Sequence, residues 1–131
     1  MKAPVWVLRE VVLAVHDQLI AAFGGAAGLR DAGVLDSALA RPQQHPAYAG
    51  GDTTIFDLAA AYAFGLAKNH AFVDGNKRIA FTTAVVFLEL NGYRVEATEA
   101  DAAIRTLALA TGEMKEGEYA AWLKANSKKS K

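Results

Sequence analysis

Cysteine is absent from this chain, and its absence removes several classes of function. Without thiols there can be no disulfide, no thiolate nucleophile and no cysteine-based zinc site. The 14 basic and 14 acidic side chains cancel at pH 7, which argues against a protein whose main task is to coat nucleic acid. No run approaches the roughly 18 apolar residues of a membrane span, and no signal-peptide core is present. The sequence thus predicts a cytoplasmic protein that binds neither membranes nor nucleic acid directly.

Proline is also scarce, with three residues, whereas 28 of the 131 residues are alanine. Alanine has the highest intrinsic helix propensity, so the composition favours helices. Hydrophobic residues make up 53% of the chain, which is long enough to bury one core. We therefore expect a single domain over residues 1–131, folded as a compact all-α bundle of about six helices.

Hydrophobic periodicity and capping residues locate the expected elements. A first amphipathic helix runs from about Leu8 to Phe23 and ends at two glycines. A short helix from Val34 should stop before Pro42, because a residue that precedes proline avoids helical angles, and residues 42–54 should form a loop. Further helices are expected over residues 55–69, 76–90, 98–110 and 116–125, with an extended piece at 93–97. The basic tail, residues 126–131, has nothing to bury and is expected to fray.

One nine-residue segment, residues 70–78, lies between two helices that are expected to be buried, and its charge is unusual. Asn76 is a good N-cap for the helix that follows. Lys77 and Arg78 then occupy the first helical turn, where the positive end of the helix dipole disfavours cations. Exposed amide groups and two cations at a helix start form an anion site, so a bound phosphate would remove the conflict.

Three other residues of this segment suit a reactive site. His70 can act as a general base, because the unperturbed pKa of histidine lies near neutrality. Asp74 is a hard oxygen ligand of the kind that holds Mg²⁺ beside substrate phosphates, and Phe72 can anchor the loop to the core. Together they suggest transfer of a nucleotide-derived group. An ordinary interpretation also exists for each feature: a structural histidine, a common Asp-Gly turn and a solvated pair of cations.

The other two histidines indicate no site. His16 lies beside Asp17 on a polar helix flank and is predicted to lie at the surface. His45 falls in the expected long loop, and its position indicates no function. No His-Glu-x-x-His zinc motif and no P-loop pattern occurs.

Residues 70–78 resemble the signature of the Fic/Doc family, and in particular its Doc (death-on-curing) branch, the toxins of type II toxin–antitoxin systems. Residues 28–42, 87–92 and 110–113 also resemble that branch, so the similarity spans about residues 5–125. The resemblance implies the helical Fic/Doc fold with at most a short extended flap. Residues 42–54 fall where Fic-type proteins carry the flap that positions the target segment.

The resemblance also implies an activity. Fic proteins that transfer AMP usually have glycine at the position of Lys77, whereas Doc-like proteins have lysine, bind ATP reversed and transfer its γ-phosphate to a protein hydroxyl. A long cation there would crowd the α-phosphate and meet a different phosphate. The implied roles are a general base at His70, a Mg²⁺ ligand at Asp74, an anion hole at Gly75 and Asn76, and phosphate contacts at Lys77 and Arg78. Lys68 is either a further phosphate contact or an exposed cation at a helix end.

The family's target class is the translation machinery, and for Doc it is elongation factor Tu. Many Fic proteins restrain themselves with a Ser/Thr-x-x-x-Glu helix, which this sequence lacks, since Lys115 stands at the glutamate position after Thr111. A toxin without its own inhibitor needs one in trans, which implies a Phd-type antitoxin partner. Two alternatives are AMP transfer, against which Lys77 argues, and a catalytically inactive antitoxin-binding module, against which the intact motif argues.

Overall fold

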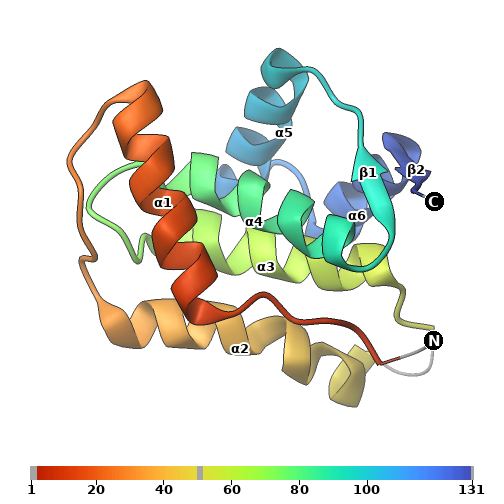
Figure 1. The fold of residues 1–131 in the computed structure, drawn as a ribbon. Coiled ribbons are helices and arrows are strands. Elements are labelled where there is room, and N and C mark those ends of the chain that lie inside the picture. Colours follow the sequence, from red (N-terminus) through yellow and green to blue (C-terminus); the bar gives the residue numbers. More distant parts are fainter. Residues whose placement is uncertain (1–2, 50–51, 131) are drawn as a thin grey trace.

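The computed structural model describes residues 3–49 and 52–130, and six α-helices dominate these ranges (Figure 1). The elements in chain order are α1 (Arg9–Phe23), α2 (Ala32–Ala49), α3 (Ile55–Asn69), α4 (Asn76–Leu90), β1 (Tyr93–Val95), α5 (Glu99–Thr111), α6 (Glu116–Ala125) and β2 (Ser127–Lys129). The two short strands pair antiparallel and form the one sheet of the described ranges. The expected all-α fold is therefore confirmed.

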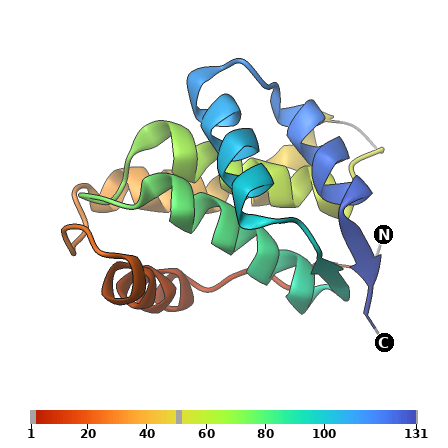
Figure 2. The same cartoon turned by 90° about the horizontal axis from the view of Figure 1, so that it is seen from above.

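Helix α3 lies at the centre of the bundle and packs against α2, α4, α5 and α6 (Figures 1 and 2). Ten of its 15 residues are buried, and five of these are alanines, so neighbouring helices can approach closely. Helix α2 approaches closely at Gly65, where an added Cβ would lie 3.1 Å from the Cα of Ala38. The expectation of a largely buried helix over residues 55–69 is confirmed.

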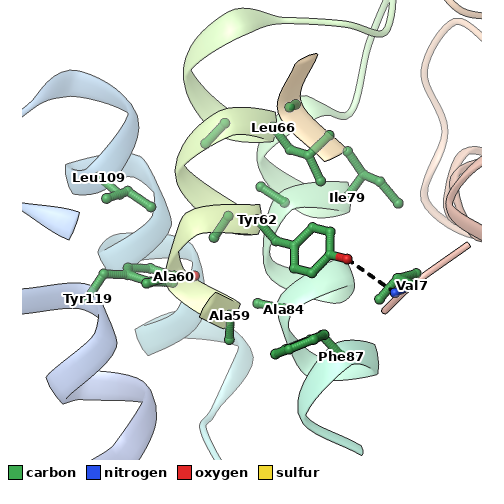
Figure 3. Close-up of a cluster of buried hydrophobic side chains, with 14 of the residues drawn as sticks. Val7, Ala59, Ala60, Tyr62, Leu66, Ile79, Ala84, Phe87, Leu109 and Tyr119 are labelled. Carbon is green, nitrogen blue, oxygen red and sulfur yellow. Dashed lines mark hydrogen bonds between the residues drawn. The ribbon is translucent and has the colours of Figure 1, made fainter. Parts of the chain in front are cut away.

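Aromatic side chains fill the core between α3 and α4 (Figure 3). Tyr62 is fully buried, and its ring centroid lies 5.2 Å from that of Phe87. Its hydroxyl accepts a hydrogen bond of 3.1 Å from the backbone N–H of Val7, so the core also fixes the chain ahead of α1. Burial raises the pKa of Tyr62 above its ordinary value.

Helix α2 corrects one sequence prediction. It begins at Ala32 and continues through Pro42 to Ala49, so residues 42–49 are not the predicted loop, and the flap role proposed for residues 42–54 loses its basis there. Residues 50 and 51 of that range lie outside the described residues. The reason is packing: Leu35, Ala38, Leu39 and Pro42 are buried at helical spacing. This continuous face against α3 outweighs the local preference that proline imposes on Arg41.

The C-terminal tail corrects a second prediction. Ser127–Lys129, expected to fray, form β2 and pair with β1 in the register Val95 opposite Ser127. Glu96 lies between Arg94 (2.7 Å) and Lys128 (3.3 Å), so two cations meet one carboxylate beside the strands. The basic tail therefore pairs with the backbone of β1 and with the carboxylate of Glu96, both far away in the sequence.

Both ends of the described chain are fastened to the turn that follows α4. The side chain of Asn91 accepts from the backbone N–H of Val5 (2.8 Å) and donates to its carbonyl (2.9 Å). The backbone N–H of Ser130 donates to the carbonyl of Gly92 (2.8 Å). Figure 1 accordingly shows N and C on the same side of the bundle, away from the loop between α3 and α4.

In the part of the chain that the structure describes, no helix combines the length and apolar character needed to cross a membrane.

Candidate active site

The loop between α3 and α4, residues 70–75, lies beside the segment that joins α1 to α2 (Figure 1). Leu29 and Phe72 form an antiparallel β-bridge between the two segments. The backbone N–H of Val73 donates to the carbonyl of Gly28 (3.0 Å). The carbonyl of Ala71 accepts from two successive N–H groups, those of Arg30 (2.8 Å) and Asp31 (3.0 Å). The loop backbone is therefore held by a remote part of the sequence.

Phe72 anchors this loop through its aromatic ring. Its side chain is 2% exposed and stacks on the imidazole of His16 in α1, with 3.8 Å between ring centroids and 15° between the planes. Nε2 of His16 donates to the carbonyl of Asp74 (2.8 Å), so Nε2 carries a proton. His16 itself is 1% exposed, and its predicted place at the surface is wrong. It lies one helical turn from Val12, the other buried residue of α1, and that spacing was the available signal.

Asn76 does not cap α4 as the sequence predicts. Gly75, with a φ of 73°, occupies the N-cap position, and the first α-helical bond of α4 joins the N–H of Ile79 to the Gly75 carbonyl (3.0 Å). The buried side chain of Asn76 instead turns back to the loop. Its Oδ1 accepts from the N–H of Phe72 (3.0 Å), and its Nδ2 donates to the carbonyl of the same residue (3.0 Å). Asn76 thus closes the loop on itself.

Asp74 is exposed, and both of its carboxylate oxygens accept backbone hydrogen bonds. Oδ1 accepts from Gly75 (3.1 Å), and Oδ2 accepts from Ala26 (3.2 Å). The close approach of Gly25 helps to set this position, because a Cβ on Gly25 would lie 2.9 Å from Oδ2 of Asp74. Each oxygen keeps a second lone pair, so the carboxylate can still bind a cation.

The cations of the segment are at the surface. Lys77 and Arg78 are exposed in the first turn of α4, where the backbone N–H groups of residues 76–78 have no intrahelical acceptor. The guanidinium of Arg78 lies over the ring of Phe23, 3.8 Å from the centroid, at the end of α1. The helix start thus places backbone amides and two cations side by side, an arrangement that suits an anion.

Lys68 is also exposed, near the end of α3. Its Nζ lies 5.6 Å from the ring centroid of Phe64 and faces Gly112 at the end of α5. In the described ranges, no hydrogen bond joins Lys68 to the motif loop, residues 70–75. The structure thus brings residues 70–78 together and places Lys68 beside Phe64 of α3 and the end of α5.

His70 follows α3 directly, at its C-cap, and its ring is exposed. Its carbonyl accepts a hydrogen bond from the side chain of Arg30, a residue to which the sequence analysis assigned no role. The signal for Arg30 was its place in residues 28–42, one of the stretches that resemble the Doc branch.

A metal ion at this loop would have few protein ligands. No group of three or more histidine, aspartate or glutamate side chains able to hold a metal occurs among residues 3–49 and 52–130. Mg²⁺ bound beside phosphates commonly takes only one or two carboxylates and keeps waters and phosphate oxygens as its other ligands. The exposed carboxylate of Asp74 fits that kind of site.

Known proteins resemble this chain over the region that contains the loop. The profile of the Fic/DOC family matches residues 6–88, which run from the segment before α1 nearly to the end of α4. The chain belongs to the Fic/DOC family. Among its relatives, Toxin Doc of Mycolicibacterium smegmatis is 47% identical over 76 residues, 58% of each chain. Protein kinase doc of Escherichia phage P1 is 36% identical over 105 residues, 80% of this chain and 82% of the relative.

Both relatives carry the name Doc, in agreement with the branch that the motif resembles. The matched region includes the loop, α1 and the segment between α1 and α2, so it contains every element that holds residues 70–78 in place.

Proposed function

We propose that this chain is a Doc-type toxin that transfers the γ-phosphate of ATP to a hydroxyl of a target protein. One observation carries the proposal: an exposed His70 and an exposed Asp74 lie on a loop fixed by backbone hydrogen bonds and followed at once by a cationic helix start. Phosphoryl transfer needs positioning and charge stabilisation more than covalent chemistry, and this loop offers both. The names of the relatives, a toxin and a protein kinase, support the same function.

Each predicted site residue has a role in this proposal. His70 takes the proton of the attacking hydroxyl, since its ring is exposed at the edge of the loop. The backbone amides of Gly75 and Asn76 at the helix start form an anion hole for phosphate oxygens, with the Gly75 N–H shared with the carboxylate of Asp74. Lys77 and Arg78 offset charge on the phosphates, and Lys68 is a further phosphate contact if the bound nucleotide extends to Phe64. Phe72 holds the loop to α1.

Asp74 would hold the Mg²⁺ that accompanies ATP. The ion, when bound, neutralises phosphate charge. The hydrogen bonds from Ala26 and Gly75 keep the carboxylate in one orientation, which favours a fixed ligand over a mobile one.

Lys77 supports phosphate transfer over AMP transfer. It is exposed at the second position of α4, where relatives that transfer AMP usually have glycine. A lysine side chain there occupies the room beside the helix start and carries a charge that can reach another phosphate.

For the target, we propose elongation factor Tu, whose modification stops translation, and for the inhibitor a Phd-type antitoxin. The resemblance to Doc supports both, and the toxin name of one relative supports the second. Such a toxin would act in the cytoplasm, where its target and ATP are found.

The experiment uses the purified chain, elongation factor Tu, Mg²⁺ and ATP labelled in separate reactions at the α or the γ position. Label from γ on the target supports the kinase, label from α supports AMP transfer, and no label supports an inactive binding module. His70→Ala should abolish transfer, and Lys77→Gly should lower the rate of γ transfer. Lys124→Gly, an exposed lysine of α6, is the matched control and should transfer at the wild-type rate.

A further inference from the structure

His70 has a backbone conformation that L-amino acids rarely adopt. Its φ is 52° and its ψ is 59°, in the left-handed region, and among the described residues it is the one non-glycine residue with a positive φ. Strain of this kind persists only where surrounding contacts enforce it, and it often marks a functional site. The conformation turns the chain at the end of α3 and thereby sets the direction of the Cα–Cβ bond that carries the imidazole of His70.

The contacts that enforce this conformation come from Arg30. Its Nε donates to the carbonyl of His70 (2.6 Å), and its Nη2 donates to the carbonyl of Asn69 (3.1 Å). The last carbonyls of a helix have no intrahelical partner, so one planar guanidinium satisfies two of them. Its positive charge also lies at the negative end of the α3 dipole, which strengthens both hydrogen bonds.

The backbone of Arg30 adds to the same support. Its N–H and that of Asp31 donate to the carbonyl of Ala71, so three successive carbonyls, 69 to 71, accept bonds from two successive residues. Asp31 is itself fixed, because its Oδ1 accepts from the N–H of Val34 in the first turn of α2 (3.0 Å). Through Arg30, the orientation of His70 is tied to the start of α2.

We infer that Arg30 is a positioning residue for His70. In the described ranges, the side-chain hydrogen bonds of Arg30 go to the backbone carbonyls of His70 and Asn69, and none joins it to the ring of His70 or to residues 74–78. It holds the His70 backbone in the left-handed conformation and so aims the exposed imidazole at the hydroxyl from which it takes a proton. This inference rests on the proposed phosphoryl transfer for its catalytic consequence, whereas the link between Arg30 and the His70 conformation is independent of any activity.

Arg30→Ala, Arg30→Lys and the control Arg94→Ala test the inference. Arg94 is also exposed and bonded through its guanidinium, but it belongs to β1 and pairs with Glu96. Arg30→Ala should lower kcat on the order of 100-fold, the cost of a misplaced catalytic group, and leave the KM for ATP unchanged. Added guanidinium ion should restore part of the kcat of Arg30→Ala. Arg30→Lys, which retains the charge without the planar fork, should be intermediate, and Arg94→Ala should match the wild type.

NMR of the histidine rings provides a readout without ATP or target. The chain has three histidines, so the His70 signals can be assigned by loss in His70→Ala. They should shift in Arg30→Ala and return with guanidinium ion, whereas the His16 signals, which report the stack on Phe72, should stay in place. Unchanged His70 signals and an unchanged kcat in Arg30→Ala would overturn the inference. If the His70 signals shift in Arg30→Ala but the wild-type protein transfers no phosphate, the proposed function is overturned and the positioning role of Arg30 stands.

If Arg30→Ala does not fold, Arg30→Lys decides the question. A Lys variant with wild-type signals and kcat contradicts the requirement for a planar fork.

Discussion

The imidazole of His16 and the ring of Phe72 stack at 3.8 Å, and the same imidazole donates to the carbonyl of Asp74. One buried side chain of α1 therefore makes an apolar and a polar contact with the loop at once. Gly75 packs beside it, since an added Cβ there would lie 3.5 Å from Nε2 of His16. Helix α1 is thus a structural support of the loop, which gives the first prediction.

His16→Ala should lower the free energy of unfolding by about 3 kcal/mol, because it removes a buried ring and leaves the Asp74 carbonyl without its donor. His16→Phe keeps a ring against Phe72 but has no donor, so we expect a smaller loss, about 1–2 kcal/mol. Urea unfolding followed by circular dichroism measures both. A loss below about 0.5 kcal/mol in His16→Ala would place the residue among ordinary surface positions.

Gly24 and Gly25 offer a matched pair of substitutions. Both have a positive φ, 87° and 112°, so alanine should cost each position about 1–2 kcal/mol of stability. A Cβ at Gly24 has nothing within 4 Å, whereas one at Gly25 would lie 2.9 Å from Asp74 Oδ2. Gly25→Ala should therefore also displace Asp74 and reduce phosphate transfer, while Gly24→Ala should transfer at the wild-type rate. Equal transfer rates for the two variants would show that the position of Asp74 does not matter.

Asn76→Asp tests the closure of the loop. The carboxylate can accept from the N–H of Phe72 but cannot donate to its buried carbonyl, so stability should fall by about 1–3 kcal/mol at pH 7. At low pH the protonated acid can donate, and the difference from the wild type should shrink. Asn91→Asp is the control, because half-buried Asn91 makes the same pair of bonds to exposed Val5, with one further bond to the carbonyl of Phe87 (2.8 Å). A larger loss in Asn91→Asp than in Asn76→Asp would contradict the assignment.

Tyr119 should make the fold sensitive to alkali. Burial raises its pKa from 10.0 to about 12, against a lesser opposing effect of the hydrogen bond with Thr106. The unfolded chain loses the proton near pH 10 and the folded chain near pH 12, so stability is complete below pH 10 and falls as the pH rises to 12. The loss should amount to about 2–3 kcal/mol. Denaturant unfolding at pH 9 and pH 11 should show about half of this loss, because pH 11 lies midway between the two pKa values. In Tyr119→Phe the fall should be clearly smaller, with the raised pKa of Tyr62 accounting for part of the remainder.

The sequence predicts helices well where local signals agree. Residues 55–69 and 76–90 match α3 and α4, because Thr54 caps the start of the first apolar run and Gly75 and Asn91 flank the second. Residues 42–49 and 127–129 were predicted wrongly for one common reason. Their structure depends on partners far away in the sequence, α3 for the first and β1 for the second. The local preferences of a proline or of a charged tail contain no information about packing on α3 or pairing with β1.

The site residues also fall into two groups, those that the local sequence indicates and those that only the fold brings to the loop. Residues 70–78 are contiguous, so their spacing alone indicated a reactive segment. His16 and Arg30 contact this segment from α1 and from the connection to α2, and a charged or polar residue in such places is ordinarily at the surface. Only the folded arrangement shows that the imidazole is buried and that the guanidinium faces two helix-end carbonyls.

The attachment of Val5 and Ser130 to the turn at Asn91 and Gly92 makes this protein convenient to engineer. Helix α4 has 15 residues, so it separates this turn from the motif loop by about 22 Å. An affinity tag, a fluorophore or a fusion partner added at either end would emerge on the far side from His70. The two ends could also be joined by a short linker and the chain reopened elsewhere, which would give a circular permutant with an undisturbed motif loop.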